Sequence, residues 1–249
     1  MGNPASDKKE QKEERASLKD KDFIIVIGRQ FGSGGRTIGK LVAQKLGIDY
    51  YDTELLAKAA ESLGVRQEIF KEQDEKRPSA LRAFLQGAYG IADNFHAVPL
   101  TGERIYTVQS KIIKDVCKKG SCVIVGRNAD FVMRKHPGLF SVFLHSPLEH
   151  RARRIMERKE AITESEAMDL AQQHDRRRES YYNFYRGEKL WGQANNYHLC
   201  LDTSTMDNES AADFIIDVAK KKFEKLCRNE VCRSERGEES PGNTGHHAF

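Results

Sequence analysis

Short apolar runs alternate with longer amphipathic stretches through most of the chain. Each run is almost continuously hydrophobic and does not switch between apolar and polar residues at every second position. Such runs are typical of strands that are buried on both faces of a parallel sheet. The runs that we interpret as strands cover residues 23–28, 48–51, 121–126, 139–145 and 197–202.

The segments between these runs carry apolar residues at intervals of three and four, which is the spacing of one face of a helix. Ile112, Ile113 and Val116 form such a stripe before the third run. A last helix over about 208–226 carries Ala212, Ile215, Ile216, Ala219 and Phe223. Strands and helices that alternate along a chain predict an α/β fold with a doubly wound parallel sheet.

Both ends of the chain differ in composition from this central part. Residues 1–22 are nearly devoid of apolar side chains, and residues 228–249 are rich in charged and small residues. Segments of this kind bury too little apolar surface to offset the entropy of ordering. We therefore predict one folded domain over residues 23–227, between two disordered tails and without internal repeats.

The bulk composition narrows the class of protein. A chain of 249 residues with 39% hydrophobic content can bury a substantial core. The net charge of +4 is too small to indicate nucleic acid as a partner. No apolar run approaches the roughly 18 residues of a membrane helix, and five cysteines form an odd set in a chain without a secretory signal. We expect a cytoplasmic protein with reduced thiols and with neither nucleic acid nor membrane as partner; the oligomeric state stays open.

The sequence GRQFGSGGRT, residues 28–37, follows the first predicted strand and opens the first predicted helix. Glycines at 32, 34 and 35 allow successive backbone N–H groups to turn toward an anion, and the helix N-terminus adds a partial positive charge. An ordinary glycine-rich turn is the alternative. Because the strand, the glycines and the helix occur together, we interpret the segment as a phosphate-binding loop.

This loop lacks the lysine of the standard pattern G-x-x-x-x-G-K-[ST]. With Gly34 as the last glycine, Gly35 falls on the lysine position, and Arg36 and Thr37 follow it. Arg29 occupies the position of the first glycine. Arginine is always charged and can bind two phosphate oxygens, so Arg36 or Arg29 could replace the charge of the lysine, although not its geometry.

Several segments together resemble the cytidylate kinase-like family of bacterial P-loop proteins. They are GRQFGSGGRTIGKLVAQKLGIDYYDTELL, CVIVGRNADFVM, FSVFLHSPLEHRARRIMER, DRRRESYYNFY and YHLCLDTS, and the similarity covers about residues 23–226. The resemblance implies a three-layer P-loop fold with a five-stranded parallel sheet. It also implies a helical monophosphate-binding insert at about 55–118 and a helical lid at about 150–190.

The comparison with true cytidylate kinases shows what is kept in this chain and what is changed. Their G-R-D segment, which faces the monophosphate, is here Gly126, Arg127 and Asn128. Their R-A-x-R-R motif is present in part as residues 151–154, and their second lid motif survives as Asp175 and Arg178. These last two residues are three apart, so they share a helix face, and Asp175 could hold Arg178 in place.

Arginines gathered on a lid suit phosphoryl transfer, because the protein must mainly position the reactants and neutralise the charge on the transferred group. The alternative for each single arginine is a solvated helix face. Asp52, at the end of the second predicted strand, could contact a substrate or cap the helix that begins at Thr53 or Glu54.

The sequence thus predicts an ATP-dependent kinase of a small phosphorylated acceptor, for which the resemblance implies a nucleoside monophosphate such as CMP or dCMP. ATP and Mg²⁺ are the expected cofactors. A nucleotide-binding sensor without catalysis and a kinase of a non-nucleotide metabolite remain alternatives. The expected catalytic residues are Arg36, Arg154 and Arg178; the nucleotide-binding residues are Arg29, Gly32, Ser33, Gly34, Gly35, Arg36 and Thr37, with Thr37 also at the metal; the acceptor-binding residues are Asp52, Arg127, Asn128 and Asp175.

Overall fold

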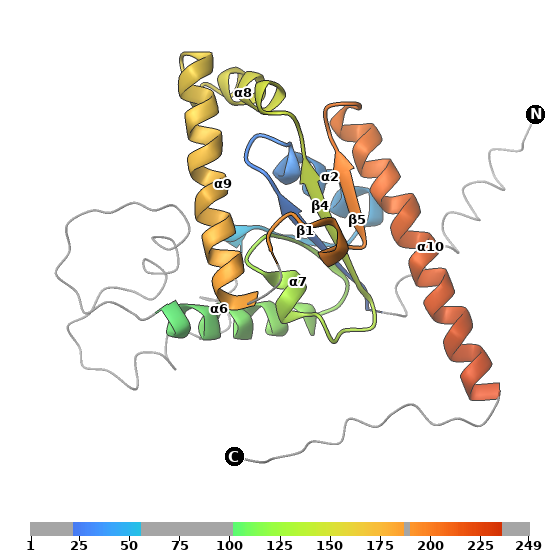
Figure 1. Cartoon of the computed structure of the whole chain (residues 1–249). Helices are drawn as coiled ribbons and strands as arrows, with labels where there is room; N and C mark the ends of the chain where they lie inside the picture. Colours follow the sequence, from blue (N-terminus) through green and yellow to red (C-terminus); the bar gives the residue numbers. More distant parts are fainter. Residues whose placement is uncertain (1–21, 56–101, 187–189, 236–249) are drawn as a thin grey trace, which may run out of the picture.

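The computed structural model describes residues 22–55, 102–186 and 190–235. Five strands form one parallel sheet in the order β2-β3-β1-β4-β5, which confirms the predicted fold class (Figure 1). The strands are β1 (Ile24–Arg29), β2 (Asp49–Tyr51), β3 (Cys122–Val125), β4 (Leu139–His145) and β5 (Leu199–Asp202). The helices are α2 (Gly35–Leu46), α6 (Gly102–Cys117), α7 (Ala129–Val132), α8 (Leu148–Glu157), α9 (Glu164–Arg186) and α10 (Asn208–Glu235), with a 3₁₀ turn at Ala194–Asn196.

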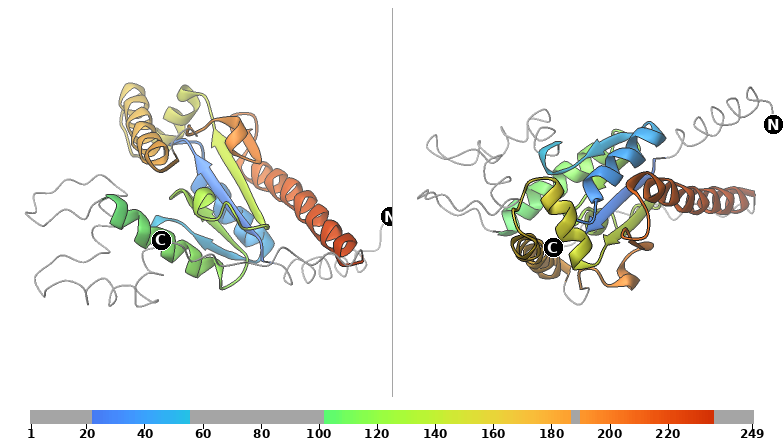
Figure 2. Two further views of the ribbon diagram at one scale, coloured as in Figure 1. Left: turned by 60° about the horizontal axis from the view of Figure 1, so that its bottom comes forward. Right: turned by 90° about the horizontal axis from the view of Figure 1, so that it is seen from above.

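The central strand shows why the domain has three layers. Successive side chains of a strand point to opposite faces, and β1 is apolar on both. Ile25 and Ile27 pack with α2 and α10 in one core, whereas Ile24 and Val26 pack with α6 and α7 in a second core on the other face (Figure 2). These four side chains are at most 2% exposed, and burying each stabilises the fold by roughly 1.5–3 kcal/mol.

Helices α8 and α9 form a smaller unit beside the loop that joins β1 to α2. They pack on each other through Ala152, Ile155, Ala167 and Ala171, which are all buried. The far end of α9 reaches α6 and α7, where the Tyr181 hydroxyl donates to Gln109 Oε1 at 2.6 Å. The segment predicted as a lid is thus a helical pair, and α9 contacts the rest of the domain through its middle, at Asp175, and through its C-terminal part, at Tyr181 (Figure 1).

One boundary differs from the prediction. Helix α10 continues to Glu235, although we expected the folded domain to end at 227. The sequence from 227 to 235 contains neither glycine nor proline, and the first glycine after it is Gly237. Without a helix-breaking residue the helix continues.

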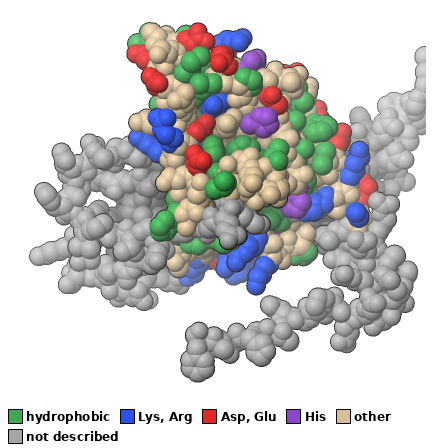
Figure 3. Space-filling view, viewed as in Figure 1, with side chains coloured by type: hydrophobic (Ala, Val, Ile, Leu, Met, Phe, Trp, Pro, Cys, Tyr) green, Lys and Arg blue, Asp and Glu red, His purple; other side chains and the backbone are tan. Residues whose placement is uncertain are grey.

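Other predictions fall outside the described residues. They include the N-terminal tail, most of the C-terminal tail and the part of the monophosphate-binding insert that precedes α6. None of the helices in the described ranges is both long enough and apolar enough to cross a bilayer. On the face drawn in Figure 3, basic and acidic side chains occur side by side over α8 and α9.

Candidate nucleotide-binding site

The glycine-rich loop turns sharply between the end of β1 and the start of α2. Gly32 and Gly34 have φ angles of 84° and 85°, which a side chain would strain. Gly34 is the N-cap of α2, and no side chain caps the helix there. The first turn of α2 contains no acidic residue either. Its first amides and its dipole are therefore left to bind an anion, as expected for a phosphate-binding loop.

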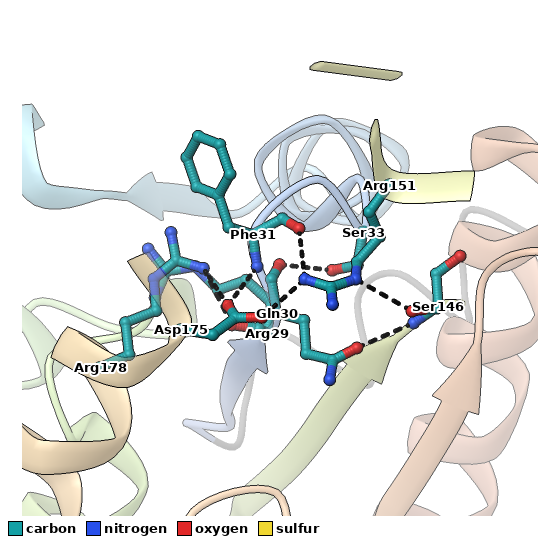
Figure 4. Close-up of polar contacts among 8 residues, drawn as sticks. All are labelled: Arg29, Gln30, Phe31, Ser33, Ser146, Arg151, Asp175 and Arg178. Carbon is teal, nitrogen blue, oxygen red and sulfur yellow. Dashed lines mark hydrogen bonds and ion pairs between the residues drawn. The ribbon is translucent and has the colours of Figure 1, made fainter. Parts of the chain in front are cut away.

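Arg151 of α8 fixes the outer side of this loop (Figure 4). Its Nη1 donates to the Phe31 carbonyl at 3.0 Å, and its Nε donates to the Ser146 carbonyl at 3.0 Å. A Cβ at Gly32 would lie only 2.8 Å from Arg151 Cβ and 2.9 Å from its carbonyl oxygen. Gly32 is therefore required by this close approach as well as by its φ angle.

Asp175 of α9 links the loop to the lid (Figure 4). Its carboxylate accepts hydrogen bonds from the Phe31 amide at 2.7 Å and from Arg151 Nη1 at 2.6 Å. Arg178 Nη1 lies 3.7 Å from Asp175 Oδ1, which confirms that these two residues share a helix face. Burial raises the pKa of Asp175, and its hydrogen bond from Phe31 and the nearby arginines act in the opposite direction.

Four arginines from four different elements face the same region beside the loop. Arg178 Nη1 donates to the Arg29 carbonyl at 3.1 Å. Burial, followed by the charges of Arg178 and Arg127, lowers the pKa of Arg29 well below its ordinary value. Burial, opposed by the charge of Asp175, lowers the pKa of Arg178 to about 10, and the charges of Arg36 and Arg127 act in the same direction as burial. Like charges held this close together favour the binding of a polyanion.

Two members of this group, Arg127 and Arg36, also contact the residues that directly follow β2. Arg127 Nε and Nη2 donate to Thr53 Oγ1 at 3.3 and 3.2 Å. Arg36 is half exposed, and its guanidinium lies 3.8 Å from Asp52 Oδ2 and 3.7 Å from Glu54 Oε1. The Arg36 side chain therefore extends toward the end of β2.

The turn after β3 has an unusual backbone. Gly126, Arg127 and Asn128 have φ angles of 82°, 60° and 53°, so three successive residues are left-handed. Each non-glycine residue in this region costs of order 1 kcal/mol or more, and such strain is concentrated at functional sites. Asn128 is buried, and its Nδ2 has no hydrogen-bond partner in the described part of the chain. This amide is a donor available to a bound acceptor.

Asp52 is buried at the carboxyl end of the sheet and caps the following helix. Its Oδ1 accepts from the amides of Glu54 and Leu55 at 3.0 and 3.1 Å, which confirms the capping alternative. The other oxygen, Oδ2, accepts from the Tyr50 hydroxyl at 3.4 Å. Because capping uses Oδ1, Oδ2 remains on the side of Arg36. Asp52 can therefore both cap the helix and contact a substrate.

Arg154 lies on the opposite side of the loop from Arg127. Its Nη1 and Nη2 donate to Oγ1 and the carbonyl of Thr203, at 3.1 and 2.9 Å. A Cβ at Gly34 would lie 3.4 Å from Arg154 Nη1, so this guanidinium is beside the loop. The Thr203 hydroxyl in turn donates to the Ser33 carbonyl at 2.9 Å.

Thr37 is the third residue of α2, and it is exposed in the first turn of the helix, next to the loop. Within the described ranges no group of three or more His, Cys, Asp or Glu side chains could hold a metal ion. A magnesium ion here would therefore depend on Thr37 and on the oxygens of a bound phosphate, which fits the usual binding of Mg²⁺ through few protein ligands.

Phe31, at the tip of the loop, stacks on His174 of α9. The ring centroids are 4.1 Å apart, and the rings are inclined by 11°. The guanidinium of Arg178 also lies over the Phe31 ring, 5.3 Å from its centroid. Burial, followed by the charges of Arg178 and Arg177, lowers the pKa of His174 to about 4.

The lowered pKa of His174 predicts that the folded protein loses stability in acid. The pKa of His174 in the folded protein is below its value in the unfolded chain, so protonation favours unfolding as the pH falls from about 6.5 to 4. The effect should be about 1 kcal/mol, because half-exposed charges are screened by solvent. We expect His174→Phe, which keeps the stack without a titratable group, to gain stability relative to the wild type over this range in urea titrations. A constant difference between the two proteins from pH 7 to 4 would contradict this assignment.

The sequence predictions missed two residues that hold the site together. Arg151 was recognised only as the first letter of a motif, although it anchors both the loop and Asp175. Gln30 was not singled out, and its Oε1 accepts from the Ser146 amide at 3.1 Å. The alignment with R-A-x-R-R was the available signal for Arg151; no comparable signal pointed to Gln30.

Comparisons with known proteins identify a family and two relatives of this chain. The profile of the cytidylate kinase-like family matches residues 24–205. A cytidylate kinase of Pseudothermotoga lettingae is 25% identical over 222 residues, which are 79% of this chain and 94% of that protein. A cytidylate kinase of Fervidobacterium nodosum is 26% identical over 220 residues, covering 80% and 96% of the two chains.

A solved structure supports the fold as well. The crystal structure of an uncharacterized protein from Eubacterium ventriosum superimposes with a TM-score of 0.61 at 28% identity, over 81% of this chain and 99% of the other. The family match includes the loop, the turn after β3 and both helices of the lid. This chain belongs to the cytidylate kinase-like family.

Proposed function

We propose that this protein is an ATP-dependent phosphotransferase that acts on a nucleoside monophosphate, CMP or dCMP. The observation that carries the proposal is the convergence of Arg29, Arg36, Arg127 and Arg178 beside an uncapped, glycine-rich helix N-terminus. A site that accepts both the phosphates of ATP and a phosphorylated acceptor needs this excess of positive charge. The names of the two curated relatives supply the choice of acceptor.

In the proposed reaction the backbone amides from Gly32 to Thr37 bind the phosphates of the donor. Mg²⁺, held with the help of Thr37, would neutralise part of the phosphate charge. Arg127, Asn128 and Asp52 orient the acceptor, and Asp175 positions Arg178 at the transferred group. Arg36 and Arg154 contribute further positive charge from the two sides of the loop.

The transfer itself is a direct displacement. An oxygen of the acceptor phosphate forms a bond to the γ-phosphorus of ATP, while the bond from that phosphorus to the bridging oxygen of ADP breaks. The acceptor oxygen is already anionic near neutral pH, so no general base is required. The positive charges of the site stabilise the charge that spreads over the transferred group.

The decisive experiment measures ADP released from MgATP, alone and with each common ribonucleoside and deoxynucleoside monophosphate. We expect CMP or dCMP to stimulate release at least about tenfold over ATP alone, and the diphosphate product to appear in equal amount. An Arg178→Met preparation made in parallel reports any contaminating kinase. ATP binding without stimulation by any nucleotide would refute the proposed acceptor.

One observation favours a second function. Gly35 occupies the position of the lysine of standard loops, and loss of that lysine could leave a protein that binds ATP without transferring phosphate. Such a sensor would respond to ATP through the contact between the loop and α9. ATP binding measured by calorimetry, without ADP release for any acceptor, would establish this alternative.

A further inference from the structure

A neighbouring side chain, and not the backbone conformation, favours glycine at position 35. It is the first residue of α2, and its φ angle is not in the left-handed region. Its backbone would therefore accept any L-amino acid. A Cβ built there, however, would lie 2.9 Å from Arg29 Cβ and 2.8 Å from Arg29 Cγ. The stem of Arg29 occupies the space in which a side chain at position 35 would begin.

The head of Arg29 lies against the backbone of a second glycine. A Cβ at Gly126 would meet the guanidinium of Arg29, with Cζ at 2.9 Å. The side chain thus runs from the start of α2, beside Gly35, to the backbone of the turn after β3. Because Gly126 directly precedes Arg127, the guanidinium lies between the loop and the residues assigned to the acceptor.

The charge of Arg29 is not compensated within the described part of the protein. In that part of the protein, Arg36 pairs with Asp52 and Glu54. Arg151 and Arg178 pair with Asp175. None of these ion pairs includes Arg29. The charges of Arg178, Arg127 and Arg36 all act to lower its pKa. A partly buried cation in such surroundings is costly unless an anion binds beside it.

We propose that Arg29 replaces the missing lysine of the phosphate-binding loop. In standard loops the lysine sits directly after the last glycine and reaches the β- and γ-phosphates. Here the cation comes from the first position of the loop, passes over Gly35, and delivers its guanidinium toward the transferred phosphoryl group. The inference rests on the proposed function for the identity of the phosphates, but the exclusion of a side chain at position 35 does not.

On this proposal the domain cannot hold a long side chain at both position 29 and position 35. Substitutions that move the cation from position 29 to position 35 test this. Gly35→Lys alone should lower the melting temperature by roughly 3–10 °C, because it overpacks the stem of Arg29. The double variant Arg29→Gly/Gly35→Lys supplies the first glycine and the lysine of the standard pattern, with Arg36 in place of its final Ser or Thr, and should recover most of this loss. Arg29→Gly/Gly35→Met, which fills the same space without a charge, should recover it equally well.

Measurements of activity separate the effect of the positive charge from the effect of packing at these two positions. Arg29→Gly should reduce kcat for the nucleotide-stimulated release of ADP by about 100-fold or more. Arg29→Gly/Gly35→Lys should be at least about tenfold faster than Arg29→Gly, whereas Arg29→Gly/Gly35→Met should remain as slow. The same order should hold for ATP affinity measured by calorimetry.

The proposal would be overturned by either of two results. One is an Arg29→Gly variant with wild-type kcat and wild-type affinity for ATP; the other is a Gly35→Lys variant with wild-type stability and activity. If the wild type binds ATP but no acceptor stimulates turnover, the proposed function fails by itself. The ATP affinities and melting temperatures of the four variants then still decide whether Arg29 takes the place of the lysine.

Discussion

Replacing Arg151 by methionine is expected to lower the free energy of unfolding by about 3–5 kcal/mol, the cost of breaking a buried ion pair from one side. Only 7% of the Arg151 side chain and 13% of the Asp175 side chain are exposed. The substitution would leave the Asp175 carboxylate buried, with the Phe31 amide as its remaining close donor. It would also remove the hydrogen bonds that Arg151 makes to the carbonyls of Phe31 and Ser146.

Urea denaturation at pH 7 measures this change, and the same helix offers a control. Arg153 is exposed, so Arg153→Met should change the stability by no more than about 0.5 kcal/mol. Adding Asp175→Asn to Arg151→Met should restore part of the loss, because the buried carboxylate that has lost its closer partner is then replaced by a neutral group. An Arg151→Met protein within 1 kcal/mol of the wild type would show that the loop and lid do not depend on this pair.

Replacing Arg178 by methionine is expected to reduce kcat by about 100- to 1000-fold, the usual cost of removing one donor that stabilises developing charge. Arg178 is the member of the arginine group that comes from the lid, and it lies next to Arg29. Its side chain is 25% exposed, and Asp175 lies within 3.7 Å of it. We therefore expect a large effect on transfer and a smaller one on the affinity for ATP.

The neighbouring arginine on α9 provides the comparison for this second experiment. Arg177 is exposed and makes no ion pair with another described residue, so Arg177→Met should retain kcat within about twofold. Steady-state assays of both variants, with melting curves to confirm folding, separate catalysis from stability. Equal losses in the two variants would indicate a general effect of lid charge instead of a specific role for Arg178.

The sheet could be predicted from the sequence because its strands are buried on both faces. Five continuous apolar runs predicted the five strands to within two residues, and the glycine-rich segment was predicted to join the end of β1 to the start of α2. These signals are local. The same is true of Asp175 and Arg178, whose spacing of three on one helix was enough to predict that they lie together.

The connections within the site could not be predicted, because they join residues that are far apart in the chain. The Phe31 amide and Asp175 are separated by 144 positions, and the Phe31 carbonyl and Arg151 by 120. The choice between Arg29 and Arg36 as a substitute for the lysine was also open. It depends on which stem passes over Gly35, and this is a property of the packed loop.

The contact between Gly35 and Arg29 also constrains how such a loop can evolve. A chain that acquires lysine at 35 while it keeps Arg29 has two side chains in one space, and a chain that loses Arg29 first has no cation at that place. Either single step passes through a less fit protein. The two positions should therefore change together in descent, and a lineage with one arrangement is separated from the other by a barrier that no single substitution crosses.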